Sequence, residues 1–336
     1  MKQAPASTTG TISRRPMWAV RAVALAFSAL VAAAAGFAFA PRPAPAFAAT
    51  QALPTRVAIN ALATVGTRLV AVGEQGLAFY SDDGGAHWRE AQRQASHGAT
   101  LNDVHFSADG RIGIAVGHGG LILKSLDGGA SWREAAADAQ SSEPLLAVRA
   151  ASAQQWLAGG SFGRLLRSDD GGASWQRVDI GREDRHLYGV AVGSGGVWLA
   201  VGERGLMLRS ADGGRSFEPL PEVYAGSFFG VQALGPARWL AYGMRGTVLR
   251  SDDDGRHWAR ADTGAAPSFF GALQRRDGAI VLVGQGGAVY ESSDGGRRFV
   301  PKRAGGRLSL TSVAATANGA LLFAGEGGLL DDAQRP

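Results

Sequence analysis

The chain has 336 residues, of which 49 are glycine and none is cysteine. Without cysteine there is neither a disulfide framework nor a thiolate metal site. The formal charge of +5 comes entirely from five basic residues in the first 48 positions, because the remainder holds 29 basic and 29 acidic residues. A body of balanced charge lacks the basic footprint of a nucleic-acid-binding protein, so we expect no nucleic-acid partner.

Residues 1–48 have the three parts of a secretory signal peptide. Residues 1–21 are polar and basic, residues 22–40 form an uncharged, alanine-rich run, and Ala46-Phe47-Ala48 gives a small-x-small cleavage pattern. The alternative is a retained membrane anchor, because the uncharged run is just long enough to span a bilayer. In both cases the body is exported, and we expect it in a bacterial periplasm. The Arg14-Arg15 pair leaves twin-arginine export open beside the general secretory route.

Residues 49–336 are predicted to form one domain built from seven copies of a unit of just over forty residues. The first six units have four apolar segments each, of which the second ends in Gly-x-x-Gly and the third runs into a serine. A period in the forties made of short strands is typical of a propeller blade. We therefore predict an all-β fold, a seven-bladed β-propeller of four-stranded antiparallel blades.

The first segment of every unit carries a small or short residue at its third position. Small residues there let the innermost strands approach one another around a propeller axis. These positions are Ala61, Asp103, Ala147, Gly189, Gly230, Gly271 and Ser312. The glycines of the Gly-x-x-Gly turn supply the positive φ that a tight hairpin requires.

Six of the seven units contain a box of the form Ser-x-Asp-x-Gly-x-x-Trp or Phe. Its aromatic positions follow one another at intervals of 44, 43, 42, 41 and 41 residues. The serine and aspartate side chains can bond the turn backbone, so we assign the box a structural role in locking the hairpin between strands three and four. The box residues are Ser81, Asp83, Gly85, Trp88, Ser125, Asp127, Gly129, Trp132, Ser168, Asp170, Gly172, Trp175, Ser210, Asp212, Gly214, Phe217, Ser251, Asp253, Gly255, Trp258, Ser292, Asp294, Gly296 and Phe299.

The seventh unit stops after its third segment and has no box. A blade without its fourth strand has an open sheet edge, which propellers normally cover. The segment at about 48–57 has no repeat role of its own. We predict that it forms an N-terminal strand that pairs onto the last blade and closes the ring.

The repeated unit V-G-x-x-G-x-h-h-x-S-x-D-G-G-x-x-W, as in Val72 through Trp88, makes the body resemble the Asp-box (BNR) propellers. More narrowly, residues 50–332 resemble the Ycf48/HCF136 family of photosystem II assembly factors. The resemblance implies an exported, non-enzymatic, monomeric scaffold that binds a membrane protein and carries no cofactor. In non-photosynthetic bacteria it implies instead an accessory to an envelope transporter such as an RND-type exporter, and the sequence leaves this choice open.

The candidate partner-binding residues lie on the face that holds the Gly-x-x-Gly turns and the connections between blades. Arginine beside aromatic side chains is a common interface composition, and the family resemblance favours an arginine-rich surface. The candidates are Arg164, Arg182, Arg185, Arg204, Arg245, Phe228 and Phe269. The alternative is that acids such as Glu203 and Asp184 simply pair these arginines. A second basic row, Lys124, Arg167, Arg209 and Arg250, precedes the box serine and is interpreted as local charge balance.

A glycosidase is the alternative function, because sialidases also carry Asp boxes. The sialidase Phe/Tyr-Arg-Ile-Pro sequence is missing, and the early Pro54–Val57 segment does not fit it. No pair of histidines has metal-ligand spacing. We therefore predict no catalytic residues, no metal and no cofactor, while a glycan remains open as a ligand.

Overall fold

The computed structural model describes residues 17–40, 52–94, 98–135, 142–181, 184–264, 267–303 and 305–331. The chain divides into two units, Met1–Gln51 and Ala52–Pro336. The first contains helix α1 (Met17–Phe39), whose side chains are almost all exposed. This helix is long and apolar enough to cross a membrane, a test that signal sequences also pass. The predicted cleavage pattern at 46–48 lies outside the described residues, so cleavage or retention stays a prediction.

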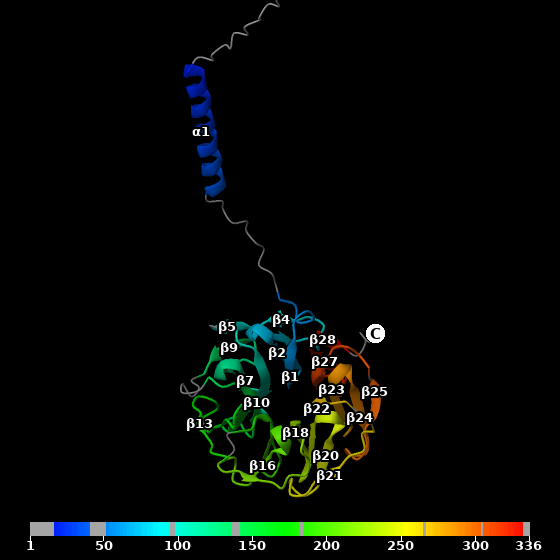
Figure 1. Ribbon diagram of the computed structural model, residues 1–336. Helices are drawn as coiled ribbons and strands as arrows, with labels where there is room; N and C mark the ends of the chain where they lie inside the picture. The colour runs from blue at the N-terminus through cyan, green and yellow to red at the C-terminus, as the bar shows by residue number, and fades with distance from the viewer. Residues whose placement is uncertain are drawn as a thin grey trace, which may run out of the picture. The chain divides into compact units, whose positions relative to one another are not determined.

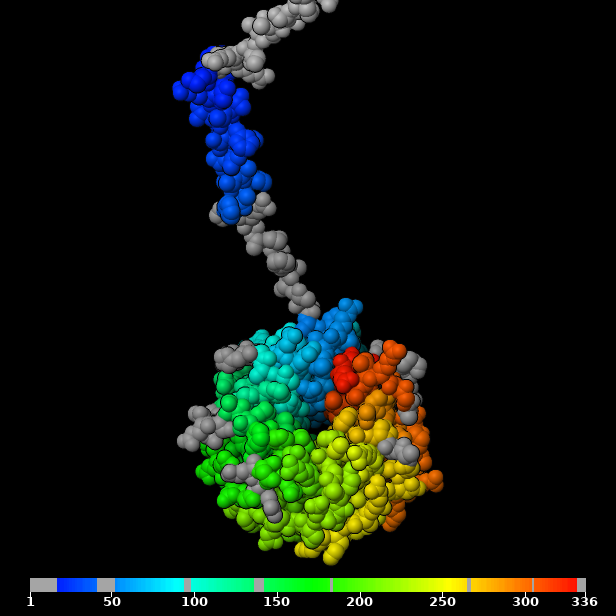
Figure 2. Space-filling model, viewed as in Figure 1, coloured from blue at the N-terminus to red at the C-terminus, as the bar shows by residue number. Residues whose placement is uncertain are grey.

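The second unit is a seven-bladed β-propeller, as the repeat predicts. Apart from one parallel strand added to the rim of blade two, each blade is an antiparallel sheet whose strands follow in chain order from the axis to the rim. Figure 1 shows the ring, in which the first and last blades lie side by side. Figure 2 shows that the ring is hollowed at its centre.

The first four blades have the following strands. Blade one is β1 (Ile59–Val65), β2 (Arg68–Gly73), β3 (Ala78–Ser81) and β4 (Arg89–Glu90). Blade two is β6 (Leu101–Phe106), β7 (Gly113–Gly117), β8 (Ile122–Ser125) and β9 (Ser131–Glu134), with β5 (Gln92–Gln94) added in parallel to β9. Blade three is β10 (Leu145–Ala150), β11 (Trp156–Gly160), β12 (Leu165–Ser168) and β13 (Gln176–Arg177). Blade four is β14 (Leu187–Val192), β15 (Trp198–Gly202), β16 (Met207–Ser210) and β17 (Glu218–Pro219).

The remaining blades continue this pattern. Blade five is β18 (Phe228–Gly235), β19 (Arg238–Gly243), β20 (Val248–Ser251) and β21 (Ala259–Arg260). Blade six is β22 (Phe269–Gln274), β23 (Ile280–Gly284), β24 (Val289–Ser292) and β25 (Val300–Arg303). Blade seven is β26 (Leu310–Ala315), β27 (Leu321–Gly325) and β28 (Gly328–Asp331).

The core lies between the blades rather than inside any one of them. Every residue of the second strands β7, β11, β15 and β23 is buried, because each of these strands has a neighbouring blade against both of its faces. Strands buried on both faces are apolar throughout instead of alternating. This explains why the second segment of each unit is a continuous run of apolar residues.

The Asp boxes contain the hydrogen bonds expected of a hairpin lock. In the third box, Ser168 Oγ donates to Asp170 Oδ1 over 2.8 Å and accepts the Gly172 amide over 2.9 Å. The Asp170 carboxylate also accepts the amide and the hydroxyl of Ser174, at 2.9 and 2.6 Å. The serine–aspartate and glycine–serine bonds recur in all six boxes.

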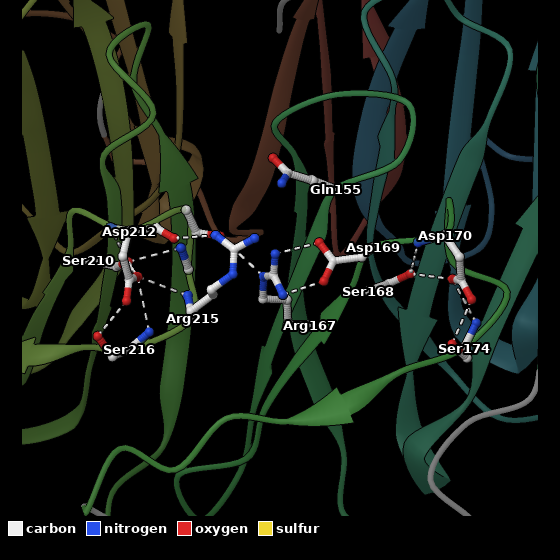
Figure 3. A network of polar contacts seen from close by, with 12 residues as sticks. Gln155, Arg167, Ser168, Asp169, Asp170, Ser174, Ser210, Asp212, Arg215 and Ser216 are labelled. Atoms are coloured by element: carbon white, nitrogen blue, oxygen red, sulfur yellow. Dashed lines mark hydrogen bonds and ion pairs between the residues drawn. The ribbon is translucent and has the colours of Figure 1, made fainter.

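The basic row that precedes the box serine joins neighbouring blades, which extends its interpretation as local charge balance. Arg167 forms an ion pair with Asp169 of its own blade, and its Nε donates to the carbonyl of Gly213 in the next box over 3.2 Å (Figure 3). Arg209 Nε donates in the same way to the carbonyl of Asp254, over 2.9 Å. Each of these cations therefore connects a third strand to the following blade's box.

The ring closes differently from the prediction. Residues 52–58 form turns and no strand, and the last blade has three strands in the part of the chain that the structure describes. Residues 48–51 of the predicted closing segment lie outside the described residues. One backbone bond, from the Leu329 amide to the Pro54 carbonyl over 2.9 Å, joins this segment to β28. Proline has no amide hydrogen, so Pro54 cannot donate to a strand ladder.

The inner strands of the first and last blades complete the closure. The Leu62 amide donates to Ser312 Oγ over 3.1 Å, and Thr311 Oγ1 donates to the carbonyl of Ile59 over 2.9 Å. These bonds link β1 to β26, so the ring is closed at its axis as well as by the turn on β28.

Replacing a box serine should destabilise the propeller, and an adjacent serine provides the control. Ser292 is buried and its Oγ bonds Asp294 and the Gly296 amide, whereas the neighbouring Ser293 is exposed. Ser292→Ala leaves a buried amide unpaired, so we expect a loss of about 1–3 kcal/mol in the free energy of unfolding, measured by denaturant titration. Ser293→Ala should change it little. Equal effects of the two substitutions would contradict the hairpin-lock role.

The boxes should also make the fold sensitive to acid. The hydroxyl of Ser174, with the other hydrogen bonds of the box, lowers the pKa of Asp170 from 3.8 to about 2. A carboxyl whose pKa is depressed on folding adds stability above its unfolded pKa and loses it as the pH falls through the folded value. We expect Asp170→Asn to flatten the dependence of the melting temperature on pH between about 4 and 2. An unchanged slope would contradict this.

Candidate functional site

The Gly-x-x-Gly turns form short 3-10 turns on the face where the inner strands begin. Five of them are η1 (Glu74–Gly76), η2 (His118–Gly120), η3 (Glu203–Gly205), η4 (Met244–Gly246) and η5 (Gln285–Gly287). The residue before the second glycine is left-handed in six of the seven turns, and in two of them that residue is itself glycine. In the other four it is Gln75, Phe162, Arg204 or Arg245, with φ between 51° and 56°.

A side chain at a left-handed position costs about 1–2 kcal/mol relative to glycine. In blades two and six the left-handed position is occupied by Gly119 and Gly286, so glycine is compatible with the fold at this position. Strain of this kind is concentrated at functional sites, so the four side chains mark this face as a candidate binding surface.

The two turn arginines differ in their surroundings. Arg204 lies 3.8 Å from the Asp184 carboxylate and 3.9 Å from Glu203, and its carbonyl accepts a bond from Arg185 Nη1 over 3.2 Å. Arg245 is exposed, and no acid pairs it among the described residues. The alternative that local acids neutralise these arginines therefore applies to Arg204 and not to Arg245.

The prediction that Arg164 belongs to the binding surface is wrong. Arg164 is only 3% exposed, and its Nη1 donates to the Glu143 carbonyl, so it is not a surface residue. It follows the second turn glycine, a slot that is buried in every blade and that lies directly before the third strand in blades one to six. The other occupants of this slot are Leu77, Leu121, Leu206, Thr247, Ala288 and Leu329. Arg182 lies outside the described residues.

The two predicted phenylalanines are also misplaced. Phe228 and Phe269 are fully buried in the core between blades, like the first residue of every inner strand. The next residues, Phe229 and Phe270, face the axis instead. The sequence prediction selected the right dipeptides and the wrong member of each.

A β-bulge at the start of every inner strand explains this change of side. The register shifts between the first and third residues in all seven blades. A bulge leaves one residue unpaired and redirects its side chain. The bulge residues are Asn60, Asn102, Leu146, Tyr188, Phe229, Phe270 and Thr311, and all seven line a cavity of about 330 Å³ at the axis.

The bulge residues contact neighbouring blades in two ways, through hydrogen bonds and through aromatic ring contacts. On one side, the Asn60 and Asn102 amides donate to the carbonyls of Leu101 and Leu145 in the next blade, each over 2.8 Å. On the other side the residues are aromatic and contact one another. The cavity mouth is therefore polar over blades one and two and aromatic over blades four to six.

The aromatic side continues outward along the face. Ring centroids are 4.8 Å apart for Phe162 and His186, 6.0 Å for His186 and Tyr188, 5.6 Å for Tyr188 and Phe229, and 5.2 Å for Phe229 and Phe270. We call these five residues the aromatic arc. They belong to the turns and inner strands of blades three to six, the same sector of the ring that carries Arg204 and Arg245.

The fold and this face define a class of protein. It is a seven-bladed Asp-box β-propeller with strained cationic turns and the aromatic arc on one face. The family model described as photosynthesis system II assembly factor YCF48 matches residues 93–193 and 147–331, and the chain belongs to this family.

Solved structures show the same fold at low sequence identity. A structure described as YCF48 bound to D1 peptide has a TM-score of 0.67 and 21% identity, covering 82% of this chain and 93% of its own. YCF48 from Cyanidioschyzon merolae has a TM-score of 0.67 and 17% identity, covering 83% and 97%. The WD40 propeller domain of Doa1 has a TM-score of 0.67 and 13% identity, covering 82% and 92%. No curated protein sequence matched the chain.

The strain at the turn arginines can be measured directly. Arg204→Gly and Arg245→Gly remove a side chain from a left-handed position, so each should raise the free energy of unfolding by about 0.5–1 kcal/mol. The same substitution at Arg276, which is exposed and not left-handed, should lower it through greater freedom of the unfolded chain. A loss of stability at Arg204 and Arg245 equal to that at Arg276 would contradict the strain.

Proposed function

We propose that this protein is an exported, non-enzymatic assembly factor that binds a segment of a membrane protein on its Gly-x-x-Gly face. The observation that carries the proposal is the presence of Arg204 and Arg245 at strained turn positions beside the aromatic arc. Exposed arginine and aromatic side chains of this kind supply most of the energy of protein interfaces.

Membership of the YCF48 family supports this role, because the family is described as a photosystem II assembly factor. The solved YCF48 structure is described as bound to a D1 peptide, which makes a segment of a membrane protein the best candidate client here. Nothing in the comparisons supports an envelope exporter as the client. The apolar helix Met17–Phe39 is consistent with export or with attachment to a membrane.

Binding would depend on surface complementarity. Arg245, with no acid beside it, would pair with a carboxylate or carbonyl of the client, and Arg204 would exchange its long contacts to Asp184 and Glu203 for closer ones. The aromatic arc would contact apolar side chains of the same segment. Burial raises the pKa of Tyr188, as does the nearby Glu203 carboxylate, so its hydroxyl stays protonated and available as a donor.

A glycan-binding propeller, or a sialidase-like glycosidase, is the second candidate. The aromatic arc favours sugar binding over hydrolysis, because aromatic rings can lie against the apolar faces of sugars. Binding on a glycan array, or release of a fluorogenic sialic acid, would favour this candidate over a protein client.

Client capture should depend on the turn arginines. We expect Arg204→Glu combined with Arg245→Glu to weaken crosslinked capture of a membrane-protein client about tenfold or more while leaving the melting temperature nearly unchanged. Arg111→Glu with Arg276→Glu makes the same charge change in exposed turns between strands one and two, on the opposite face, and serves as the control. If the two double variants captured the client equally well, this face would not be the binding surface.

A further inference from the structure

Several departures from the repeat converge on the axis below the bulge residues. The second-strand position before the turn glycine is Val72, Val116, Gly159, Val201, Val283 or Ala324 in six blades, but Tyr242 in the fifth. Asp103 is the one charged residue among the small residues of the inner strands. Arg149, His105 and Gln232 project from neighbouring positions, and Arg149 and Tyr242 line both halves of the channel.

Tyr242 reaches the channel because its partner on the inner strand has no side chain. Tyr242 pairs with Gly230, and a Cβ placed on Gly230 would lie 2.2 Å from the tyrosine hydroxyl oxygen. The residue is 8% exposed, and its hydroxyl has no hydrogen-bond partner among the described residues. Burial raises the pKa of Tyr242 to about 12, so the hydroxyl keeps its proton and can donate it.

Arg149 lines the channel together with Tyr242 and has hydrogen-bond donors without a partner among the described residues. Its Nη1 donates to Asp103 Oδ2 over 2.5 Å and to the Val148 carbonyl over 2.6 Å. Its Nε and Nη2 have no partner in the part of the chain that the structure describes, and its side chain is 34% exposed. The Asp103 carboxylate, in contrast, also accepts the amides of Val104 and Val148, each over 2.9 Å.

The remaining channel groups add no opposing charge. Burial, together with the Arg149 charge, lowers the pKa of His105 to about 3, so this imidazole is neutral at physiological pH. Gln232 contributes an amide whose Oε1 is buried without a partner among the described residues. The part of the channel that Arg149 and Tyr242 line therefore offers guanidinium and hydroxyl donors, whose complement is an anionic acceptor.

The space above these donors is apolar on one side. The upper cavity of about 330 Å³ and the lower one of about 440 Å³ share Arg149, Val231, Tyr242 and Ala272, so they are halves of one channel. Tyr188, Phe229 and Phe270 line the upper half. This volume matches the cavities that hold small organic ligands.

We propose that the central channel binds a small organic acid, with its carboxylate on Arg149 and Tyr242 and its aromatic or apolar body against Tyr188, Phe229 and Phe270. The site lies inside the ring, apart from Arg204 and Arg245. It shares Tyr188, Phe229 and Phe270 with the aromatic arc. Its donors Arg149 and Tyr242 are not part of the proposed client-binding surface, so a failure of either proposal leaves the other standing.

The test compares 3-phenylpropionate with its uncharged amide, by calorimetric titration of the full chain. We expect saturable binding of the acid and about tenfold weaker binding of the amide, because hydrogen bonds to a charged acceptor are stronger than hydrogen bonds to a neutral one. Tyr242→Phe should weaken binding of the acid about tenfold. Tyr290→Phe, a buried tyrosine of β24 that does not line the channel, is the matched control and should bind as the wild type does.

Three outcomes would overturn the proposal: no saturable binding of the acid, equal binding of acid and amide, or unchanged binding by Tyr242→Phe. A second variant, Phe229→Leu, tests the position of the body. It should weaken acid and amide by the same factor, because it changes the apolar contact and leaves the donors in place. Client capture by Tyr242→Phe should equal that of the wild type.

Discussion

The crowding of seven inner strands around one axis is the constraint on which the rest of the structure depends. Each strand must approach its neighbours closely at its third residue, where a Cβ on Gly189 would lie 2.8 Å from the Gly230 Cα. The small residue at this position relieves the contact, and the bulge immediately before it turns one side chain into the mouth of the channel. A packing requirement thus produces a ring of seven variable side chains, and this ring is where the blades differ in chemistry.

The opposite face depends on bonds that repeat from blade to blade. The serine and aspartate of each box close the hairpin of their own blade. Arg167 and Arg209 each donate a hydrogen bond to a backbone carbonyl in the next box and so connect neighbouring boxes. Because these bonds reach only between neighbours, the framework tolerates change on the other face. Left-handed arginines and a solitary second-strand tyrosine are found within an otherwise regular set of blades.

The sequence was sufficient to predict the architecture, because the period, the glycine turns and the boxes are local patterns with a direct physical meaning. It was also sufficient to place Arg204 and Arg245 in the same slot of two neighbouring turns, on the face that we propose as the binding surface. It failed for Arg164, although comparison with Leu77 and Leu206 in the same slot would have indicated burial. It failed for Phe228 and Phe269 because a bulge changes which residue faces the axis, and nothing in the residue types marks a bulge. The N-terminal segment was assigned to the right blade, but Pro54 gives it a turn where a strand was expected.

The bonds that close the ring also determine when a functional face can exist. Thr311 and Ile59 are separated by 252 residues, and Leu62 and Ser312 by 250. Contacts of such long sequence separation form late, because the entropy of closing a long loop opposes them until the intervening structure is in place. Individual blades can fold one after another, but the mouth includes Asn60 from the first blade and Thr311 from the last. The complete mouth therefore forms only after the last blade has joined the first, so an incompletely folded chain has no complete channel mouth.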